Sequence, residues 1–160
     1  MFRSKTVFVI GAGASKEAGL PTGPELRAAI ASKLDIKFKF GIDQISGDEA
    51  IYNALRLYAR NSGEDVNLYL QEAWKINEAL PQAMSIDNYI DTHRGNGRLE
   101  LCGKLAIAQS ILQAEADSLL YFADYEQETF SPTKLATTWY EPFLQILTEA
   151  VRVDDLESIF

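Results

Sequence analysis

The residues best suited to chemistry in this sequence form a glycine-rich segment near the N-terminus, Gly11–Gly23, which reads GAGASKEAGLPTG. Where side chains are missing, a phosphate group can approach the backbone closely and accept hydrogen bonds from its N–H groups. A helix that begins just beyond such a loop adds positive potential. The segment therefore indicates a loop that holds a phosphate or a nucleotide. A purely structural turn between a strand and a helix is the alternative.

Two common phosphate-binding motifs do not fit this segment. The Walker loop requires a glycine directly before its lysine, whereas Lys16 follows Ser15 and precedes Glu17. The dinucleotide fingerprint Gly-x-Gly-x-x-Gly would use Gly11, Gly13 and residue 16, and that last position is the lysine. Neither motif therefore identifies the ligand.

A third pattern does fit the segment. The letters GAGAS at Gly11–Ser15 follow an apolar run and are followed, after three residues, by GLP at Gly19–Pro21. This arrangement resembles the NAD-binding loop of sirtuins and sirtuin-like proteins. Protein deacetylases continue with Asp-Phe-Arg, whereas this chain continues with TGPEL at Thr22–Leu26. Together with Ser85–His93 and Leu101–Ala108, that continuation resembles the sirtuin-like domains of bacterial anti-phage defence proteins.

The resemblance implies that the loop binds NAD+ or a related nucleotide such as ADP-ribose. The backbone N–H groups of Ala12–Ser15 would hold the pyrophosphate, and Leu20 and Pro21 would shape the pocket beside the nicotinamide. In this group of proteins the chemistry is NAD+ binding, often with NAD+ hydrolysis (NADase or NAD glycohydrolase activity), rather than lysine deacylation. The implied cofactor-binding set is Gly11, Ala12, Gly13, Ala14, Ser15, Gly19, Leu20, Pro21 and Thr22.

Sirtuin-type hydrolysis also needs an asparagine that orients the ribose and the water, and a histidine that acts as base. Asn88 and His93 are the candidates, since NYID at Asn88–Asp91 resembles the family's asparagine motif. That motif follows an apolar strand in the family, whereas Asn88 lies in an amphipathic helical pattern. His93 is open to three interpretations: an exposed residue at a helix end, a contact to the ribose, or the base. The catalytic residues therefore stay unassigned.

The counts of cysteine and histidine exclude several kinds of site. Cys102 is the one cysteine, so an internal disulfide and the four-cysteine zinc ribbon of the deacetylases are ruled out. His93 is the one histidine, so a metal site with two or three histidines from one chain is ruled out too. We expect no metal, and we expect Cys102 to be a small buried apolar residue rather than a reactive thiol.

The elements that position the loop are predicted to be one strand and a series of helices. Residues 5–10 form a short β-branched and aromatic run, which is typical of a buried parallel strand. Pro24 suits the first position of a helix over 24–33, and residues 35–46 read as a short strand or an extended loop. Apolar spacing then predicts helices over 51–58, 66–80, 85–92 and 99–120, and from 131 to 150.

Three details of these helices can be predicted from single residues. Ser85 has the side chain of an N-cap, and Pro142 should kink or split the last helix. On the long helix over 99–120, we expect one face to be apolar and buried: Leu101, Leu105, Ala108 and Leu112.

A single parallel strand cannot form a sheet, so we expect its partner strands outside this chain. The predicted fold is α/β, a Rossmann-like nucleotide-binding domain of the sirtuin type that is incomplete and has a large helical portion. Residues 1–160 would be its N-terminal part, with the strand, the glycine loop and the first helix in 1–34 and a mainly helical portion in 47–151. The catalytic strands would lie beyond Phe160, and this length of chain would be inactive alone.

Composition restricts the partners. The 160 residues are 47% hydrophobic and 24% charged, which fits one cytoplasmic globular domain, and no apolar run approaches the ~20 residues of a membrane span. The net charge of −8 disfavours general nucleic-acid binding but not one small anionic ligand. The alternative function is a non-catalytic helical module in 47–151 for homo-oligomerisation or partner binding. A flavin- or NAD-dependent oxidoreductase is a third reading.

Overall fold

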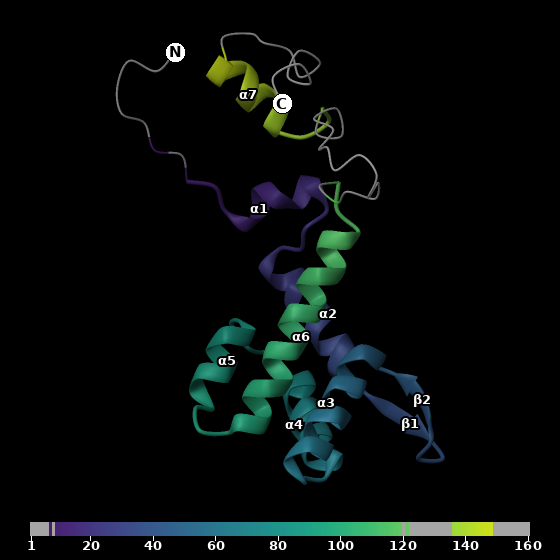
Figure 1. Ribbon diagram of the computed structural model, residues 1–160. Helices are drawn as coiled ribbons and strands as arrows, with labels where there is room; N and C mark the ends of the chain where they lie inside the picture. The colour runs from purple at the N-terminus through teal and green to yellow at the C-terminus, as the bar shows by residue number, and fades with distance from the viewer. Residues whose placement is uncertain (1–6, 8, 120, 122–135, 149–160) are drawn as a thin grey trace. The chain divides into compact units, whose positions relative to one another are not determined.

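Helices make up most of the protein, as Figure 1 shows for the computed structural model. The structure describes residues 7, 9–119, 121 and 136–148. The chain divides into two units: a terminal unit, Met1–Thr22 with Ala114–Phe160, and a central unit, Gly23–Gln113. Among the described residues, no helix is long and apolar enough to cross a membrane.

The central unit is built from helices and one hairpin. It begins with α2 (Gly23–Leu34), followed by β1 (Lys37–Lys39) and β2 (Asp43–Ser46). Then come α3 (Glu49–Ser62), α4 (Val66–Ala79), α5 (Ile86–Thr92) and the greater part of α6 (Gly97–Ala116). The apolar spacing and helix-start residues of the sequence predicted each of these helices.

Side chains just before α3, α4 and α5 satisfy N–H groups that a helix leaves unpaired in its first turn. Asp48 accepts from an N–H of α3 at 3.0 Å, and Asp65 from an N–H of α4 at 2.9 Å. Ser85 accepts from an N–H of α5 at 3.1 Å, so the predicted N-cap is confirmed. These short polar residues fix where each helix begins.

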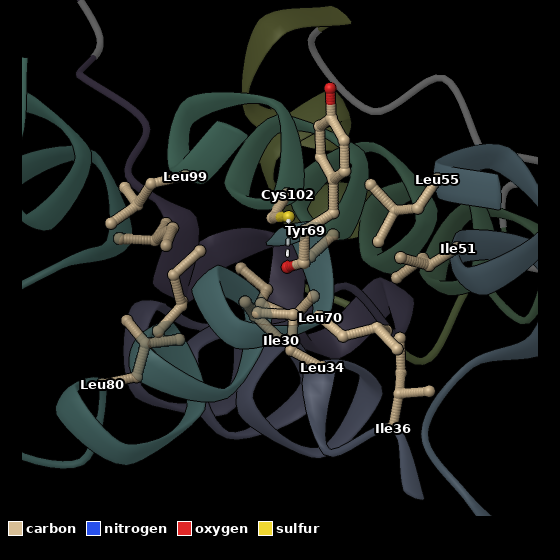
Figure 2. Packing of buried hydrophobic residues seen from close by; sticks show 14 of the residues in the cluster. Ile30, Leu34, Ile36, Ile51, Leu55, Tyr69, Leu70, Leu80, Leu99 and Cys102 are labelled. Carbon is tan, nitrogen blue, oxygen red and sulfur yellow. Dashed lines mark hydrogen bonds between the residues drawn. The ribbon is translucent and has the colours of Figure 1, made fainter. Parts of the chain in front are cut away.

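The core of the central unit lies where its helices meet. Figure 2 shows side chains from α2, α3, α4 and α6 packed together, with Ile36 from the segment after α2. Burying each large aliphatic side chain contributes about 1.5–3 kcal/mol, so this cluster is the main source of the unit's stability. Its members are Ile30, Leu34, Ile36, Ile51, Leu55, Ala59, Tyr69, Leu70, Ala73, Ile76, Leu80, Ile86, Leu99, Cys102 and Ala106.

The buried face of α6 differs from the predicted one. Ala108 and Leu112 are exposed, and Leu101 and Leu105 are half-buried. The face that packs inward carries mostly small residues: Leu99, Cys102, Gly103, Ala106 and Ser110. Small side chains let α6 approach α5 closely, because a Cβ at Gly103 would lie only 2.5 Å from Cδ1 of Ile90. Backbone proximity, rather than side-chain hydrophobicity, therefore decides which face is buried.

The ambiguous segment 35–46 is an antiparallel hairpin. Its register pairs Lys37 with Ser46, Phe38 with Gln44 and Lys39 with Asp43. Phe38 packs edge-on against Tyr52 of α3, with ring centroids 4.8 Å apart, and this contact anchors the hairpin to the helices.

Asp48 joins three elements at the base of the hairpin. Its carboxylate pairs with Lys33 of α2 at 2.8 Å, caps α3, and accepts from Gln109 of α6 at 3.4 Å. The backbone N–H of Asp48 also donates to the Lys33 carbonyl at 2.8 Å. Burial raises the pKa of Asp48, but Lys33, the Ile51 N–H and Gln109 together outweigh burial and lower that pKa below 3.8.

The terminal unit contains α1 (Ala12–Ser15), the 3₁₀ turn η1 (Lys16–Ala18), the end of α6 and α7 (Tyr140–Thr148). Helix α7 begins two residues before Pro142, so Pro142 lies in its first turn, and the described residues 136–139 before it are not helical. A proline is tolerated in the first turn because its missing N–H would be unpaired anyway. Residues 131–135 and 149–150 of the predicted last helix lie outside the described residues.

The predicted buried strand at 5–10 is not formed by its described residues. Val7, Val9 and Ile10 are outside regular secondary structure, with 85%, 93% and 56% of their surface exposed. A strand needs a neighbour for its N–H and C=O groups, and the described residues offer none here. Residues 5, 6 and 8 lie outside the described part. The described fold is therefore α-rich with one small antiparallel sheet.

Replacing Gly47 should destabilise the central unit strongly. Gly47 has a φ of +78°, and a Cβ there would lie 2.7 Å from Cα of the fully buried Ile36. We expect Gly47→Ala to lower the free energy of unfolding by about 2–4 kcal/mol in urea denaturation. The control is Gly63→Ala, which also has a positive φ (+71°) but open space, and should cost only about 1 kcal/mol. Equal losses would contradict the close-approach explanation.

The Asp48 carboxylate should stabilise the fold only while it is ionised. Its folded-state pKa is lowered, so its contribution is present above 3.8 and disappears as the pH falls through the folded value. We expect Asp48→Asn to lose about 1 kcal/mol at pH 7 and the difference from wild type to shrink in acid. Asp91→Asn is the control, because the Asp91–Arg94 pair is exposed and its loss should cost a few tenths of a kcal/mol at most. A pH-independent difference would contradict this account.

Candidate functional site

The glycine loop is a short helical turn. Gly11 is extended, with φ −96° and ψ 173°, and the chain turns into α1 directly after it. The Ala14 N–H donates to the Gly11 carbonyl at 3.0 Å, and the Leu20 N–H donates to the Ser15 carbonyl at 3.1 Å. The turn is held by its own backbone, since no side chain caps α1.

The first half of the loop leaves its backbone accessible. Gly11, Ala12 and Gly13 are exposed, and a Cβ at Gly11 or Gly13 would meet no atom within 4 Å. No described residue accepts a hydrogen bond from the N–H of Ala12 or Gly13, or forms a hydrogen bond with the half-buried Ser15 hydroxyl. These groups are available donors, and anionic oxygens are the acceptors that such donors bind most strongly.

The second half of the loop is occupied by packing. Gly19 has a φ of +94°, and a Cβ there would lie 3.3 Å from Cα of Ser118. The Leu119 N–H donates to the Ala18 carbonyl at 2.9 Å, which ties the loop to the turn after α6. The predicted binding residues Leu20, Pro21 and Thr22 are half-buried. Gly19 therefore has a structural reason to be glycine that involves no ligand.

Trp139 holds the loop from its carbonyl side. The indole N–H of Trp139 donates to the Ala14 carbonyl at 2.8 Å, and its backbone N–H donates to the Glu17 carboxylate at 2.6 Å. The Trp139 ring also packs on Phe143 of α7, with centroids 5.4 Å apart. The sequence analysis did not connect Trp139 to the loop, because these positions are far apart in sequence. The only signal was the general tendency of a part-buried indole to seek an acceptor.

Asn88 and His93 occupy structural positions in α5 of the central unit. Asn88 is exposed in the first turn, where its backbone N–H donates to Ser85. His93 follows the last turn and is exposed. Its Nδ1 lies 2.8 Å from the Tyr89 carbonyl, so the proton is on Nδ1 and the ring stacks on Tyr89 at 4.3 Å. Of the three interpretations of His93, the structure shows the helix-end position.

Cys102 is not a reactive thiol. It is fully buried in the core, and its Sγ donates to the Tyr69 carbonyl at 3.3 Å (Figure 2). Burial, followed by the charge of Glu72, raises the pKa of the thiol to about 12, so the thiolate is absent at neutral pH. Among the described residues, no group of three or more His, Cys, Asp or Glu side chains could hold a metal ion.

The described residues thus bring together one set of available groups in the terminal unit: the N–H groups of Ala12 and Gly13 and the hydroxyl of Ser15. These groups can bind an anion but cannot transfer a proton at neutral pH or attack a substrate without a base. Comparison of the chain with protein-family models, with curated proteins and with solved structures gives no match.

Proposed function

We propose that the glycine loop binds NAD+, or a nucleotide derived from it, as part of a sirtuin-like, Rossmann-related domain. The observation that carries this proposal is the open backbone at Gly11–Gly13, where two N–H groups lack acceptors among the described residues and no side chain blocks approach. The sequence string Gly11–Pro21 supports the choice of ligand through its resemblance to sirtuin loops.

Neutral donors suit a phosphate ligand in this chain. With a net charge of −8, the protein repels a dianion at long range, so binding has to come from short hydrogen bonds at the site. Backbone N–H groups supply such bonds without a counter-charge, and each bond to an ionised oxygen contributes about 1.5–3 kcal/mol. The Ser15 hydroxyl can add one more bond at the same turn.

The proposal extends to the reaction of the intact protein, in bacterial defence against phage. Water adds to C1 of the nicotinamide ribose as the bond to nicotinamide breaks, which yields nicotinamide, ADP-ribose and one proton. The transition state resembles an oxocarbenium ion, and the loop's part is to hold the pyrophosphate so that this ribose is fixed in place. The asparagine and the base of this reaction are not assigned to described residues.

Nucleotide binding at the loop is tested by calorimetric titration of the full chain with NAD+ and with ADP-ribose. We expect a dissociation constant on the order of 0.1 mM for at least one of them. Gly13→Val should weaken binding at least ~10-fold, because its side chain would cover the N–H groups at a position where a Cβ meets nothing within 4 Å. Gly97→Val is the matched control: it is also exposed and open, but at the start of α6, and should bind as wild type does.

A second measurement separates binding from folding. Trp139 donates to the loop's Ala14 carbonyl, and in a Trp74→Phe background it is the one remaining tryptophan. Saturating nucleotide should change its fluorescence, and should not do so in Gly13→Val. If neither nucleotide binds at millimolar concentration while the circular dichroism spectrum is native, the nucleotide proposal is wrong.

The purified 160-residue chain should bind NAD+ without consuming it. Asn88 of α5 and His93 directly after α5 are both exposed, and no hydrogen bond among the described residues joins their two side chains. An assay that follows nicotinamide release should show no turnover. Sustained consumption that Asn88→Ala abolishes would contradict this and make Asn88 catalytic.

A further inference from the structure

The first turn of the glycine loop has little of its own to keep it wound. Helix α1 spans only four residues, buries none of them and has no side-chain cap. A single helical turn fixes several backbone dihedrals for one hydrogen bond, and glycine adds to the entropy lost when the turn is ordered. The N–H groups of Ala12 and Gly13 share one direction only while this turn is wound. Contacts from elsewhere in the terminal unit should therefore matter for their arrangement.

Trp139 supplies two such contacts. Its indole N–H donates to the Ala14 carbonyl at 2.8 Å, and its backbone N–H donates to the carboxylate of Glu17 at 2.6 Å. Carbonyls at the end of a helix lack partners within it, and a donor from outside stabilises them. One bond reaches α1 and the other reaches η1, so Trp139 fixes the two consecutive turns of the loop at once.

Trp139 is itself fixed at the start of α7. Its carbonyl accepts from the Phe143 N–H at 3.2 Å, and its ring packs on Phe143 with centroids 5.4 Å apart. Just before it, the hydroxyl of the buried Thr138 accepts from the Tyr140 N–H at 3.3 Å. The half-buried indole is therefore held by its own helix, and a held side chain loses little further entropy when it donates to the loop.

We propose that Trp139 is a positioning residue for the nucleotide: it keeps the glycine loop in the conformation in which the Ala12 and Gly13 N–H groups can bind the pyrophosphate. This inference rests on the proposed nucleotide binding. Trp139 acts through the Ala14 carbonyl and Glu17 rather than by touching the ligand. A loop that is only partly in its binding conformation binds more weakly in proportion to that fraction, and Trp139 raises the fraction.

The role given to Glu17 is separate from its charge. An exposed carboxylate close to the loop repels an anionic ligand, so its charge alone weakens binding. As the acceptor for the Trp139 N–H, the same carboxylate supports the loop and strengthens binding. A change that removes the charge and keeps the acceptor can therefore be compared with one that removes both.

The indole bond is tested by calorimetric titration of full-chain variants with NAD+ and with ADP-ribose. Trp139→Phe keeps an aromatic ring and the backbone bond to Glu17 but loses the indole donor. It should raise the dissociation constant ~3- to 10-fold, as expected for one hydrogen bond. Trp74→Phe is the matched control, because the Trp74 indole also donates to a backbone carbonyl at 2.8 Å, that of Ile36 in the central unit. It should bind as wild type does.

The Glu17 contact is tested by a pair of variants that share the loss of charge. Glu17→Gln keeps a side-chain oxygen that can accept from the Trp139 N–H, whereas Glu17→Ala has no acceptor. We expect Glu17→Ala to bind nucleotide ~3-fold or more weakly than Glu17→Gln does. An effect of charge alone would make the two variants equal. Because Glu17 is exposed, this pair tests the role even where Trp139→Phe alters the stability of the terminal unit.

The indole N–H signals in a proton–nitrogen NMR spectrum give a readout that a general loss of stability would not produce. The chain has two tryptophans, and Trp74→Phe assigns their signals. Saturating NAD+ should shift the Trp139 signal and slow the exchange of its proton with water, because the ligand and the indole stabilise the same loop conformation. The Trp74 signal should stay where it is.

The outcomes separate this inference from the nucleotide proposal. If wild type binds a nucleotide and a natively folded Trp139→Phe binds it equally well, the positioning role is wrong and nucleotide binding stands. Equal affinities of Glu17→Ala and Glu17→Gln would likewise overturn the role of the Trp139–Glu17 bond. If wild type binds neither nucleotide at millimolar concentration, both proposals are wrong.

Discussion

The central unit depends on the junction formed by Gly47 and Asp48. A partly buried carboxylate is tolerated only when other groups replace its lost water, and Asp48 finds them on α2, α3 and α6. Gly47 lets the chain pass against the buried Ile36 at a distance that no side chain would allow. Together these residues set where the hairpin leaves the helices and where α3 begins. The apolar core then packs between the helices that this junction holds together.

Outside that junction, the two units leave different kinds of groups uncovered. In the terminal unit, the uncovered groups are backbone donors at Ala12 and Gly13, while the rest of the loop is held by Trp139 and by the turn after α6. In the central unit, they are the apolar side chains of the β1–β2 hairpin, Phe40, Ile42 and Ile45. Unpaired donors suit an anion.

Local sequence was enough for most helices, because their apolar spacing and their caps are properties of neighbouring residues. Ser85 as a cap is an example. Local sequence gave the wrong prediction where an element's structure depends on a partner far away in the chain. The apolar run that contains Val7 and Val9 has strand-like residues, yet a strand exists only when another strand pairs with it. The inward face of α6 was misjudged because Gly103 packs by the absence of a side chain, which hydrophobicity does not register.

The sequence by itself determined the helical elements, the glycine-rich turn and the absence of a multi-cysteine metal site, because each depends on residues close together or on a simple count. Only the tertiary structure decided which glycines are open and which are packed. Gly13 and Gly19 belong to one motif, but a Cβ at Gly19 would lie against Ser118, whereas a Cβ at Gly13 would meet nothing within 4 Å. It also decided that Trp139 reaches the Ala14 carbonyl and that Phe40 reaches nothing in the core. Those outcomes depend on contacts between residues far apart in the chain, and no local pattern of residue types encodes such contacts.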